Sequence, residues 1–273
     1  MAMADGSGVV SSDIVGYQNV DLANGYSLFT ATFKGIGNVT TFDLTDMTPK
    51  TPAGVNITGN GKVLVYVLDT AGNYGTPYAW YGSLGGWSTD GATTIPANTV
   101  TLGDGVGVAV YNSLKVLATT GAESTARQAV STNAVFQVSG AVELTPANAT
   151  VSGYSLSGNN TPVAIDLAEI TPVTTNGVAI TGNGKVLVYL LDTAGNYGTP
   201  YAWYGAQSGW STDNGTSVVP SKTVMLSPGQ GFAVYNSLKV LPTTGAESTA
   251  RQAVASPAVL NLPPPVTTSG GQD

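Results

Sequence analysis

Apolar and polar residues alternate along much of this chain, which is the pattern of β-strands that bury one face. One hairpin is predicted where residues 62–69, rich in β-branched side chains, are followed by a turn-rich link and a second extended run at 78–81. Another hairpin is predicted from residues 99–102 and 106–112, around the Gly-Asp-Gly turn between them. Further strands are expected at residues 14–22, 26–33 and 135–138. Short strands separated by Gly, Asn and Pro predict an antiparallel β-sandwich or jelly roll.

A large part of the chain occurs twice. Residues 54–90 match residues 177–213 at 32 of 37 positions, and residues 111–130 match residues 235–254 at 19 of 20 positions. Matches of this length indicate a tandem duplication. The fronts of the two units, before these blocks, differ more, although both contain Gly-Tyr-Ser-Leu. We expect such divergent fronts to contact different neighbours.

The duplication divides the 273 residues into two domains. We predict an all-β protein with two tandem homologous antiparallel β-sandwich or jelly-roll-like domains, at residues 12–138 and 139–262. Residues 1–11 are expected to form an N-terminal arm. Residues 263–273, which begin with three prolines, are expected to form a flexible tail.

Each domain is also predicted to contain one short helix. The best candidate is Ala122–Val130, where the preceding Thr-Thr-Gly can cap the first turn and Glu123 lies four residues before Arg127. The pair recurs in the second unit as Glu247 and Arg251. We interpret it as part of a surface helix that crosses between the sheets, rather than as an acid–cation catalytic pair.

The composition favours strands and turns and disfavours several kinds of partner. Only 9% of the residues are charged while 42% are hydrophobic, against a usual charged share of about 25%. Surfaces of this kind are common where a protein packs against copies of itself or lies outside a cell. The net charge is −7 and no run of Lys or Arg occurs, so we expect no nucleic-acid partner and no attachment to an anionic membrane. No apolar run approaches 18 residues, so no membrane span is expected.

The chain contains no Cys and no His. It therefore lacks thiolate chemistry, the usual general base near neutral pH and the commonest metal ligands. Asp69–Asn73 and its copy Asp192–Asn196 resemble part of a calcium loop, but a tight turn bonded to its own backbone explains them as well, and we favour the turn. The remaining acidic residues that we considered for paired-carboxylate hydrolysis form no recognisable pattern: Asp43, Asp46, Asp69 and Asp90. We expect no catalytic residue, no metal and no cofactor.

Aromatic residues form the most distinctive block of each unit. Exposed rings beside Asn and Asp could stack on a sugar ring, whereas buried rings would fill the core of a sandwich or a contact between subunits. We favour the second interpretation and keep the block as the candidate contact with a glycan or a partner. The block consists of Tyr74, Tyr78, Trp80, Tyr81 and Trp87 in the first unit and of Tyr197, Tyr201, Trp203, Tyr204 and Trp210 in the second, and the candidate contact comprises all of them except Tyr74 and Tyr197.

Three motifs, taken in order, carry a resemblance to known proteins. They are Gly-Tyr-Ser-Leu at the front of each unit, then Gly-Asn-Tyr-Gly-Thr-Pro-Tyr-Ala-Trp-Tyr-Gly with a following Gly-Trp, then Gly-Gln-Gly-Phe-Ala-Val-Tyr at residues 229–235. In this order the chain resembles β-rich tandem-repeat proteins of bacteriophage virions and bacterial surfaces. The resemblance covers both units and implies a virion or an extracellular location.

The leading hypothesis is a non-enzymatic structural protein of a larger assembly, as the capsid-decoration, head-fibre or tail protein of a bacteriophage. Its partners would be copies of itself or other structural proteins. The alternative is a tandem carbohydrate-binding or adhesin module, in which two weak glycan sites gain avidity. A surface hydrolase that uses Asp pairs is a third hypothesis. The first residues show no positive region and no apolar region of a signal peptide, which fits assembly inside the producing cell or a mature chain with seven foreign residues in front.

Overall fold

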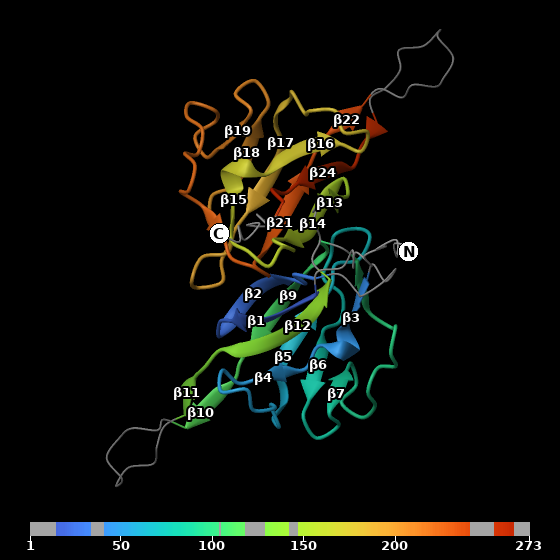
Figure 1. Cartoon of the computed structure of the whole chain (residues 1–273). Helices are drawn as coiled ribbons and strands as arrows, with labels where there is room; N and C mark the ends of the chain where they lie inside the picture. Colours follow the sequence, from blue (N-terminus) through green and yellow to red (C-terminus); the bar gives the residue numbers. More distant parts are fainter. Residues whose placement is uncertain are drawn as a thin grey trace, which may run out of the picture.

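The computed structural model describes residues 15–33, 41–103, 105–117, 129–141, 147–240 and 254–264. These residues form an all-β protein with two similar halves, stacked end to end (Figure 1). Each half contains a five-stranded and a three-stranded antiparallel sheet. The predicted fold class, all-β with two homologous antiparallel units, is therefore confirmed.

The elements follow the same order in both halves. In the first half they are β1 Val15–Leu22, β2 Gly25–Thr30, β3 Thr41–Asp43, the 3₁₀ turn η1 Leu44–Asp46, β4 Pro49–Lys50, β5 Asn60–Tyr66, β6 Tyr78–Tyr81, β7 Gly86–Ser88, β8 Thr101–Gly103, β9 Gly107–Asn112, β10 Lys115–Leu117, β11 Ala129–Ser131 and β12 Ala134–Ala141. In the second half they are β13 Ala147–Thr150, β14 Gly153–Gly158, β15 Ile165–Asp166, the 3₁₀ turn η2 Leu167–Glu169, β16 Thr171–Thr174, β17 Asn183–Tyr189, β18 Tyr201–Tyr204, β19 Gly209–Ser211, β20 Met225–Leu226, β21 Gly231–Asn236, β22 Lys239–Val240, β23 Val254–Ala255 and β24 Ala258–Asn261.

The strand order is equivalent in the two halves. The five-stranded sheets run β2-β9-β5-β6-β7 and β14-β21-β17-β18-β19, and the three-stranded sheets run β1-β12-β4 and β13-β24-β16. Two-strand pairs complete each half: β3 with β8 and β10 with β11 in the first, β15 with β20 and β22 with β23 in the second. The three-stranded sheet covers the inner face of the five-stranded sheet, which makes each half a sandwich.

The core of the first half forms where the two sheets meet. In β5, Val63 and Val65 are fully buried and point inward, as period-2 alternation requires. Phe136 of β12 contacts Phe29 of β2 and Trp87 of β7, with ring centroids 5.1 and 6.1 Å apart. The second half has a separate core cluster of the same build, which contains Trp210, Phe232 and Leu260. Because each half has its own core, each sandwich is stabilised largely within itself.

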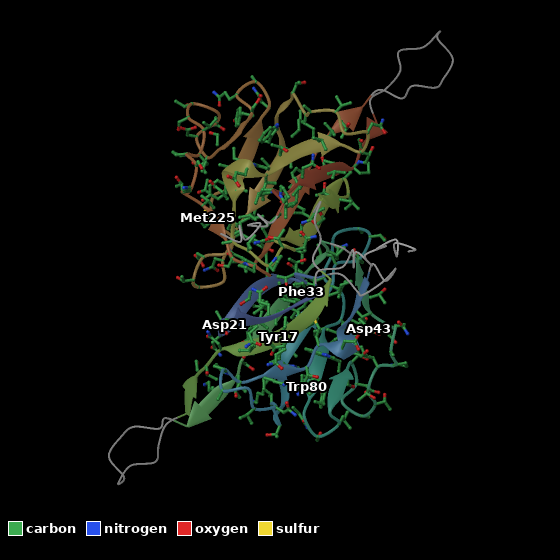
Figure 2. The ribbon with its side chains drawn as sticks, viewed as in Figure 1. Tyr17, Asp21, Phe33, Asp43, Trp80 and Met225 are labelled. Carbon is green, nitrogen blue, oxygen red and sulfur yellow. The ribbon has the colours of Figure 1, made fainter. Side chains whose placement is uncertain are left out.

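The four indoles belong to these cores. Trp80 and Trp87 lie edge to face, 5.6 Å apart, and their Nε1 atoms donate to the carbonyls of Ile57 and Met47, both at 2.8 Å. Trp80 is labelled in the first half in Figure 2. In the second half Trp203 and Trp210 repeat this arrangement: they lie 5.4 Å apart and donate to Ile180 and Ile170. A buried indole N–H needs such a partner, so these bonds orient the rings and anchor the loops that supply the carbonyls.

One predicted hairpin is confirmed and the other is wrong. β5 pairs with β6 as expected, with a bulge between Asn60 and Leu64. β8 and β9, which cover the other predicted hairpin, do not pair: β8 joins β3, whereas β9 lies between β2 and β5. The turn between them is closed by a bond from Val106 N to Gly103 O of 3.0 Å, but the chain leaves it for a different sheet. Alternation and turn residues identify strands and not their partners.

The predicted helices lie mainly outside the described residues. Of Ala122–Val130, only Ala129 and Val130 are described, and both belong to β11, which pairs with β10. That end of the predicted helix is therefore wrong, because a neighbouring strand supplies backbone partners for it. Glu123, Arg127 and their copies lie outside the described residues. In the parts of the chain that the structure describes, helical conformation is limited to the two 3₁₀ turns.

The strand β12 crosses the predicted boundary between residues 138 and 139. It pairs with β1 along its whole length, from Ala134 opposite Leu22 to Ala141 opposite Val15. The next described strand is β13, which starts the second half. The predicted arm, residues 1–11, and residues 265–273 of the predicted tail lie outside the described residues.

Replacing Trp87 by Phe should destabilise the protein by about 3 kcal/mol, because the change leaves a cavity and a buried Met47 carbonyl without its donor. The measurement is urea unfolding followed by circular dichroism. The control is Tyr17→Phe, which alters a ring that is 61% exposed and should change the free energy of unfolding by less than about 0.5 kcal/mol. A Trp87→Phe loss as small as that of the control would show that this indole does not support the core.

Candidate functional site

The five-stranded sheet of the first half is apolar on both faces. In β2, β9 and β5, Phe29, Val108 and Val65 point into the core, and the residues next to them point outward. The strand register places Leu28 beside Ala109, and Ala109 beside Tyr66, in one row on the outer face. An outer face of this kind needs a cover.

The cover is the equivalent face of the second half, and the two sheets pack against each other there (Figure 1). A third apolar cluster forms between the halves and is separate from both cores. Its buried members are Leu28, Ala109, Leu156 and Ala233, with Tyr66, Leu68, Tyr189 and Leu191 packed around them. The first four residues are at most 8% exposed, so this contact excludes water at its centre. We call it the inter-half contact.

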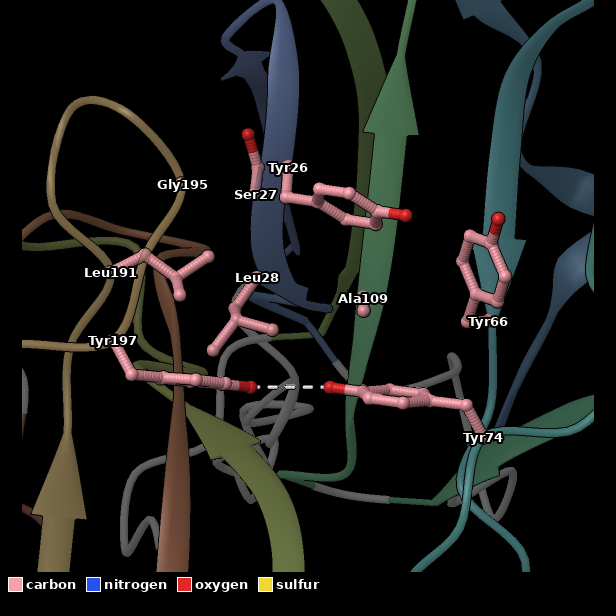
Figure 3. A pocket seen from close by; sticks show the side chains of 9 residues that line it. All are labelled: Tyr26, Ser27, Leu28, Tyr66, Tyr74, Ala109, Leu191, Gly195 and Tyr197. Atoms are coloured by element: carbon pink, nitrogen blue, oxygen red, sulfur yellow. Dashed lines mark hydrogen bonds between the residues drawn. The ribbon is translucent and has the colours of Figure 1, made fainter.

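The inter-half contact has approximate two-fold symmetry. Tyr74 and Tyr197 occupy equivalent positions of the repeat, and their hydroxyl oxygens lie 3.1 Å apart in a hydrogen bond (Figure 3). A residue that meets its own copy lies at the symmetry axis of an isologous contact. The chain is therefore built like a homodimer whose two subunits are joined in one polypeptide.

Two equivalent cavities flank this tyrosine pair. The first has a volume of about 270 Å³ and the second about 240 Å³. The first is lined by Tyr26, Ser27, Leu28, Tyr66, Tyr74 and Ala109 of the first half and by Leu191, Gly195 and Tyr197 of the second. The second is lined by the nine equivalent residues with the halves exchanged. Tyr74 and Tyr197 border both cavities, so the hydroxyl pair separates them.

Glycines at positions 72 and 195 allow the turn of each half to approach the other half closely. Gly72 has a φ of 81° and Gly195 a φ of 82°, a backbone region that other residues rarely adopt. A Cβ atom on Gly195 would lie 3.2 Å from Cβ of Tyr26, and one on Gly72 would lie 3.2 Å from the carbonyl oxygen of Tyr154. Each half therefore inserts the same turn against the front strand of the other.

Three tyrosine hydroxyls of the contact, those of Tyr66, Tyr189 and Tyr197, have a raised pKa. Burial is the main cause that raises the pKa of Tyr197, and the adjacent hydroxyl of Tyr74 raises it further. Burial also raises the pKa of Tyr66 and of its copy Tyr189. The cavities thus offer apolar walls and neutral hydroxyls, which suit a neutral ring and give no charged group for acid–base chemistry.

The predicted tryptophans do not contribute to these cavities. Trp80, Trp87, Trp203 and Trp210 are at most 5% exposed and lie inside the two cores. Their ring faces are therefore covered by other core residues. This is the interior placement that the sequence analysis favours over a stacking platform for sugars.

The four predicted tyrosines are only partly buried and also lie outside the cavities. Tyr78 and Tyr201 pack against the cores. Tyr81 and Tyr204 lie on the outer faces, each against a glycine: a Cβ atom on Gly91 would be 2.6 Å from the Tyr81 hydroxyl. The eight predicted residues are therefore not brought together in one site.

Sequence reasoning missed the tyrosines that do line the cavities, notably Tyr26, Tyr66 and their copies. One signal could have identified them. Gly-Tyr-Ser-Leu is kept in both fronts although the residues around it differ, and it forms β2 and β14, whose Tyr and Leu enter the inter-half contact. The expectation that the two fronts contact different neighbours is wrong for these strands, because β2 and β14 contact each other.

The segment Asp69–Asn73 is a closed turn. The Asp69 carboxylate oxygen Oδ1 accepts from the backbone N–H groups of Ala71 and Asn73, both at 2.9 Å, and Asp69 N donates to Asn73 O at 2.8 Å. These bonds, first that from Asn73, hold the pKa of Asp69 below its usual range. Asp192 repeats the arrangement. Within the described ranges, no three His, Cys, Asp or Glu side chains gather as a metal site.

Other acidic side chains are used in the same way. Backbone N–H groups of Thr93 and Ala92 hold the pKa of Asp90 well below its usual range. In the second half, the hydroxyls of Ser211 and Ser217 donate to Asp213 and hold its pKa well below its usual range. Asp43 and Asp166 cap the two 3₁₀ turns by accepting from the second N–H of each turn, at 3.0 Å. These carboxylates hold turns in place and do not converge on a cavity.

Each half also carries a groove at its far end. The first, of about 710 Å³, is lined by residues that include Val55, Lys62 and Lys115. The second, of about 740 Å³, is lined by residues that include Lys185 and Lys239. They lie near β10 and β22, at opposite ends of the molecule (Figure 1). We call them the end grooves.

A rigid turn presents an apolar side chain beside each end groove. In the first half, Thr51 N donates to Val55 O at 2.8 Å, and Val55 N donates to the Thr51 hydroxyl at 3.2 Å. Val178 occupies the same turn in the second half, with the same two bonds to Thr174. Both valines are 62% exposed.

Comparison of the chain with protein-family models, with curated proteins and with solved structures gives no match. Among the described residues, no helix has the length and apolar character to cross a bilayer. The inter-half contact, the two cavities beside it and the end grooves are the structural features that bear on function.

Titration of Tyr197 should make the inter-half contact sensitive to alkali. The unfolded side chain titrates near its ordinary pKa of 10.0, whereas the folded one titrates higher. The stability that the neutral hydroxyl contributes is therefore complete below pH 10 and is lost as the pH rises above it. In Tyr197→Phe this part of the pH dependence should disappear.

The measurement is the urea midpoint of both proteins between about pH 8 and pH 11.5. Tyr197→Phe should lose less stability over this range than the unchanged protein. Tyr17→Phe removes an exposed hydroxyl and is the control. Equal slopes for all three proteins would mean that the hydroxyl pair is not coupled to folding.

Proposed function

We propose that this protein is a non-enzymatic structural protein that serves as a two-ended building block of a larger assembly. The observation that carries the proposal is the symmetric inter-half contact, which fixes two copies of one sandwich in a single orientation. The surfaces that the matching blocks form, among them the end grooves, are thereby repeated on the two halves, at opposite ends of the molecule. A block with two equivalent ends can join two identical partners.

The use of the distinctive side chains supports this proposal. The indoles fill the cores, Tyr66 and Tyr189 pack around the buried leucines between the halves, and the acidic residues Asp69, Asp90 and Asp213 hold their own turns. Residues that could have formed a catalytic or binding site thus stabilise the cores, the contact between the halves and the turns. The end grooves, each beside an exposed valine on a rigid turn, are the surfaces through which we propose that copies associate.

We propose further that the assembly is a bacteriophage virion, in which the chain acts as a capsid-decoration, head-fibre or tail protein. The low charged fraction, the absence of Cys and His from the sequence and the resemblance to β-rich virion repeats support this choice. An extracellular surface is the other location that fits the same features. Mass spectrometry of purified virions from the producing host tests it, and a virion without its peptides would contradict it.

Self-association through the end grooves predicts a graded response to substitution. The unchanged protein should form species larger than a dimer of the 27.6 kDa chain. Val55→Asp or Val178→Asp alone should stop growth at dimers, because one end remains, and the double variant should be monomeric. Size-exclusion chromatography with light scattering measures the masses.

Val218→Asp is the matched control, since Val218 is also exposed but lies away from the end grooves. It should leave the assembly unchanged. A monomeric unchanged protein at high concentration, or equal masses for all variants, would contradict association through these ends.

Glycan binding is a second candidate function, and the paired cavities favour it. Each is walled by tyrosine rings and lies beside neutral hydroxyls, an arrangement that can stack on a sugar ring and bond its hydroxyls. Two equal sites in one rigid chain would gain avidity for a repeating polysaccharide. The two functions predict different results when a soluble sugar is added: only the glycan-binding function predicts that the protein binds it.

A binding site in the cavities predicts two bound sugars per chain. In isothermal titration against a panel of neutral oligosaccharides, the stoichiometry should be two, and Ala109→Phe, which fills the first cavity, should reduce it to one. Val218→Asp should retain both sites. Absence of binding across the panel would leave the structural role as the sole proposal and would end the glycan hypothesis.

A further inference from the structure

The surfaces that join the two halves are one surface used twice. Leu28 and Leu156, Ala109 and Ala233, and the flanking Tyr and Leu residues are identical at equivalent positions. In an isologous contact each surface complements itself. Each half therefore presents a surface that could accept a copy of itself as well as the other half.

Glycines preserve this complementarity at the points of closest approach. Gly107 and Gly231 occupy equivalent places in β9 and β21, each opposite the front strand of the other half. A Cβ atom on Gly107 would lie 2.8 Å from the carbonyl oxygen of Ser157, and one on Gly231 would lie 2.7 Å from the carbonyl carbon of Leu28. The backbones meet so closely that neither position has room for a side chain, and both halves satisfy this condition equally.

The symmetry is broken at the ends of the two front strands. Thr30 of β2 pairs with Gly107, and Gly158 of β14 pairs with Gly231, so the two residues hold the same place in their halves. They face each other across the contact: a Cβ atom on Gly158 would lie 2.4 Å from Cγ2 of Thr30, and also 2.8 Å from the carbonyl oxygen of Gln230 and 2.9 Å from Cα of Gly231 in its own half. Thr30 is fully buried, and its hydroxyl is held by a bond to the Val106 carbonyl at 3.1 Å.

We propose that Thr30 and Gly158 form a steric key that decides which halves can join. The space between these positions accepts one threonine methyl and not two facing side chains. Pairing of a first half with a second half fits, and pairing of two second halves, which places glycine against glycine, also fits. Pairing of two first halves would set threonine against threonine and is excluded.

The occupant that this surface would accept from outside is the second half of another copy of this chain. Within one chain the first half is favoured, because the covalent link gives it a high effective concentration. When the first half is displaced, two chains can join through their second halves. The key thus prevents pairing between first halves and leaves one route for exchange between chains.

Replacing one outer-face leucine at a time by arginine in the full chain tests which of the two surfaces can pair with its own copy. Leu28→Arg disrupts the first surface and frees the second, so this variant should dimerise. Leu156→Arg frees the first surface, which carries Thr30, so this variant should remain monomeric. Adding Thr30→Gly to Leu156→Arg should produce a dimer. All variants carry Val55→Asp and Val178→Asp, so that association through the end grooves does not contribute.

Light scattering should give a mass near 27.6 kDa for Leu156→Arg and twice that mass for the other two variants. A dimeric Leu156→Arg would overturn the exclusion of first-half pairing. A monomeric and folded Leu28→Arg would overturn acceptance of a second copy. Circular dichroism establishes that each variant is folded, which is expected because Leu28 and Leu156 lie outside the two cores.

A second set of variants tests the key without changing the charge. Gly158→Ala should lower the urea midpoint, and Thr30→Ser, which removes the colliding methyl but keeps the hydroxyl, should recover part of the loss, because the contacts of the new methyl with Gln230 and Gly231 remain. Gly231→Ala is the matched control: it is blocked by the Leu28 backbone and not by Thr30. Thr30→Ser should therefore not rescue it. Equal rescue of both alanine variants, or rescue of neither, would overturn the key.

Discussion

The packing of the two outer sheet faces against each other determines how this molecule is put together. The strand ladders that the structure describes stay within one half, and an isolated bridge between Phe29 and Gln230 crosses between them. The halves are thus joined mainly by apolar burial around Leu28 and Leu156, together with the hydroxyl pair at the axis and a backbone bond from Thr30 N to Gly229 O at 3.1 Å. Because burial of apolar area is not directional, the glycines and the tyrosines supply the orientation.

The duplication explains why this contact exists and why it is less well filled than the cores. A surface that meets its own copy must satisfy both sides with the same residues, so large side chains such as Tyr26 and Tyr154 are placed off the axis, where they leave the two cavities. Cores are close-packed, and a contact that retains cavities contributes less free energy of folding per residue. The inter-half contact is therefore the part of the described structure that we expect to open first.

The polar side chains described above hold turns and loops in place. Asp69, Asp90 and their copies accept hydrogen bonds from backbone N–H groups in tight turns, which lets long connections remain stiff although few residues are charged. The indole N–H groups of Trp80 and Trp87 tie the loops at Ile57 and Met47 to the core in a similar way.

The sequence by itself determined the duplication, several turns and seven strands of the first half, namely β1, β2, β5, β6, β8, β9 and β12, because these depend on identity between two segments, on turn residues and on local alternation. It also placed the tryptophans in the interior. It did not determine that β8 and β9 lie in different sheets, that β11 takes residues from a predicted helix, or that Tyr26 and Tyr66 line a contact between the halves. Those features depend on which strand lies beside which and on what covers an outer sheet face. Period-2 alternation records only that a face is apolar, and the tertiary structure alone decides whether a core, a second half or another molecule buries it.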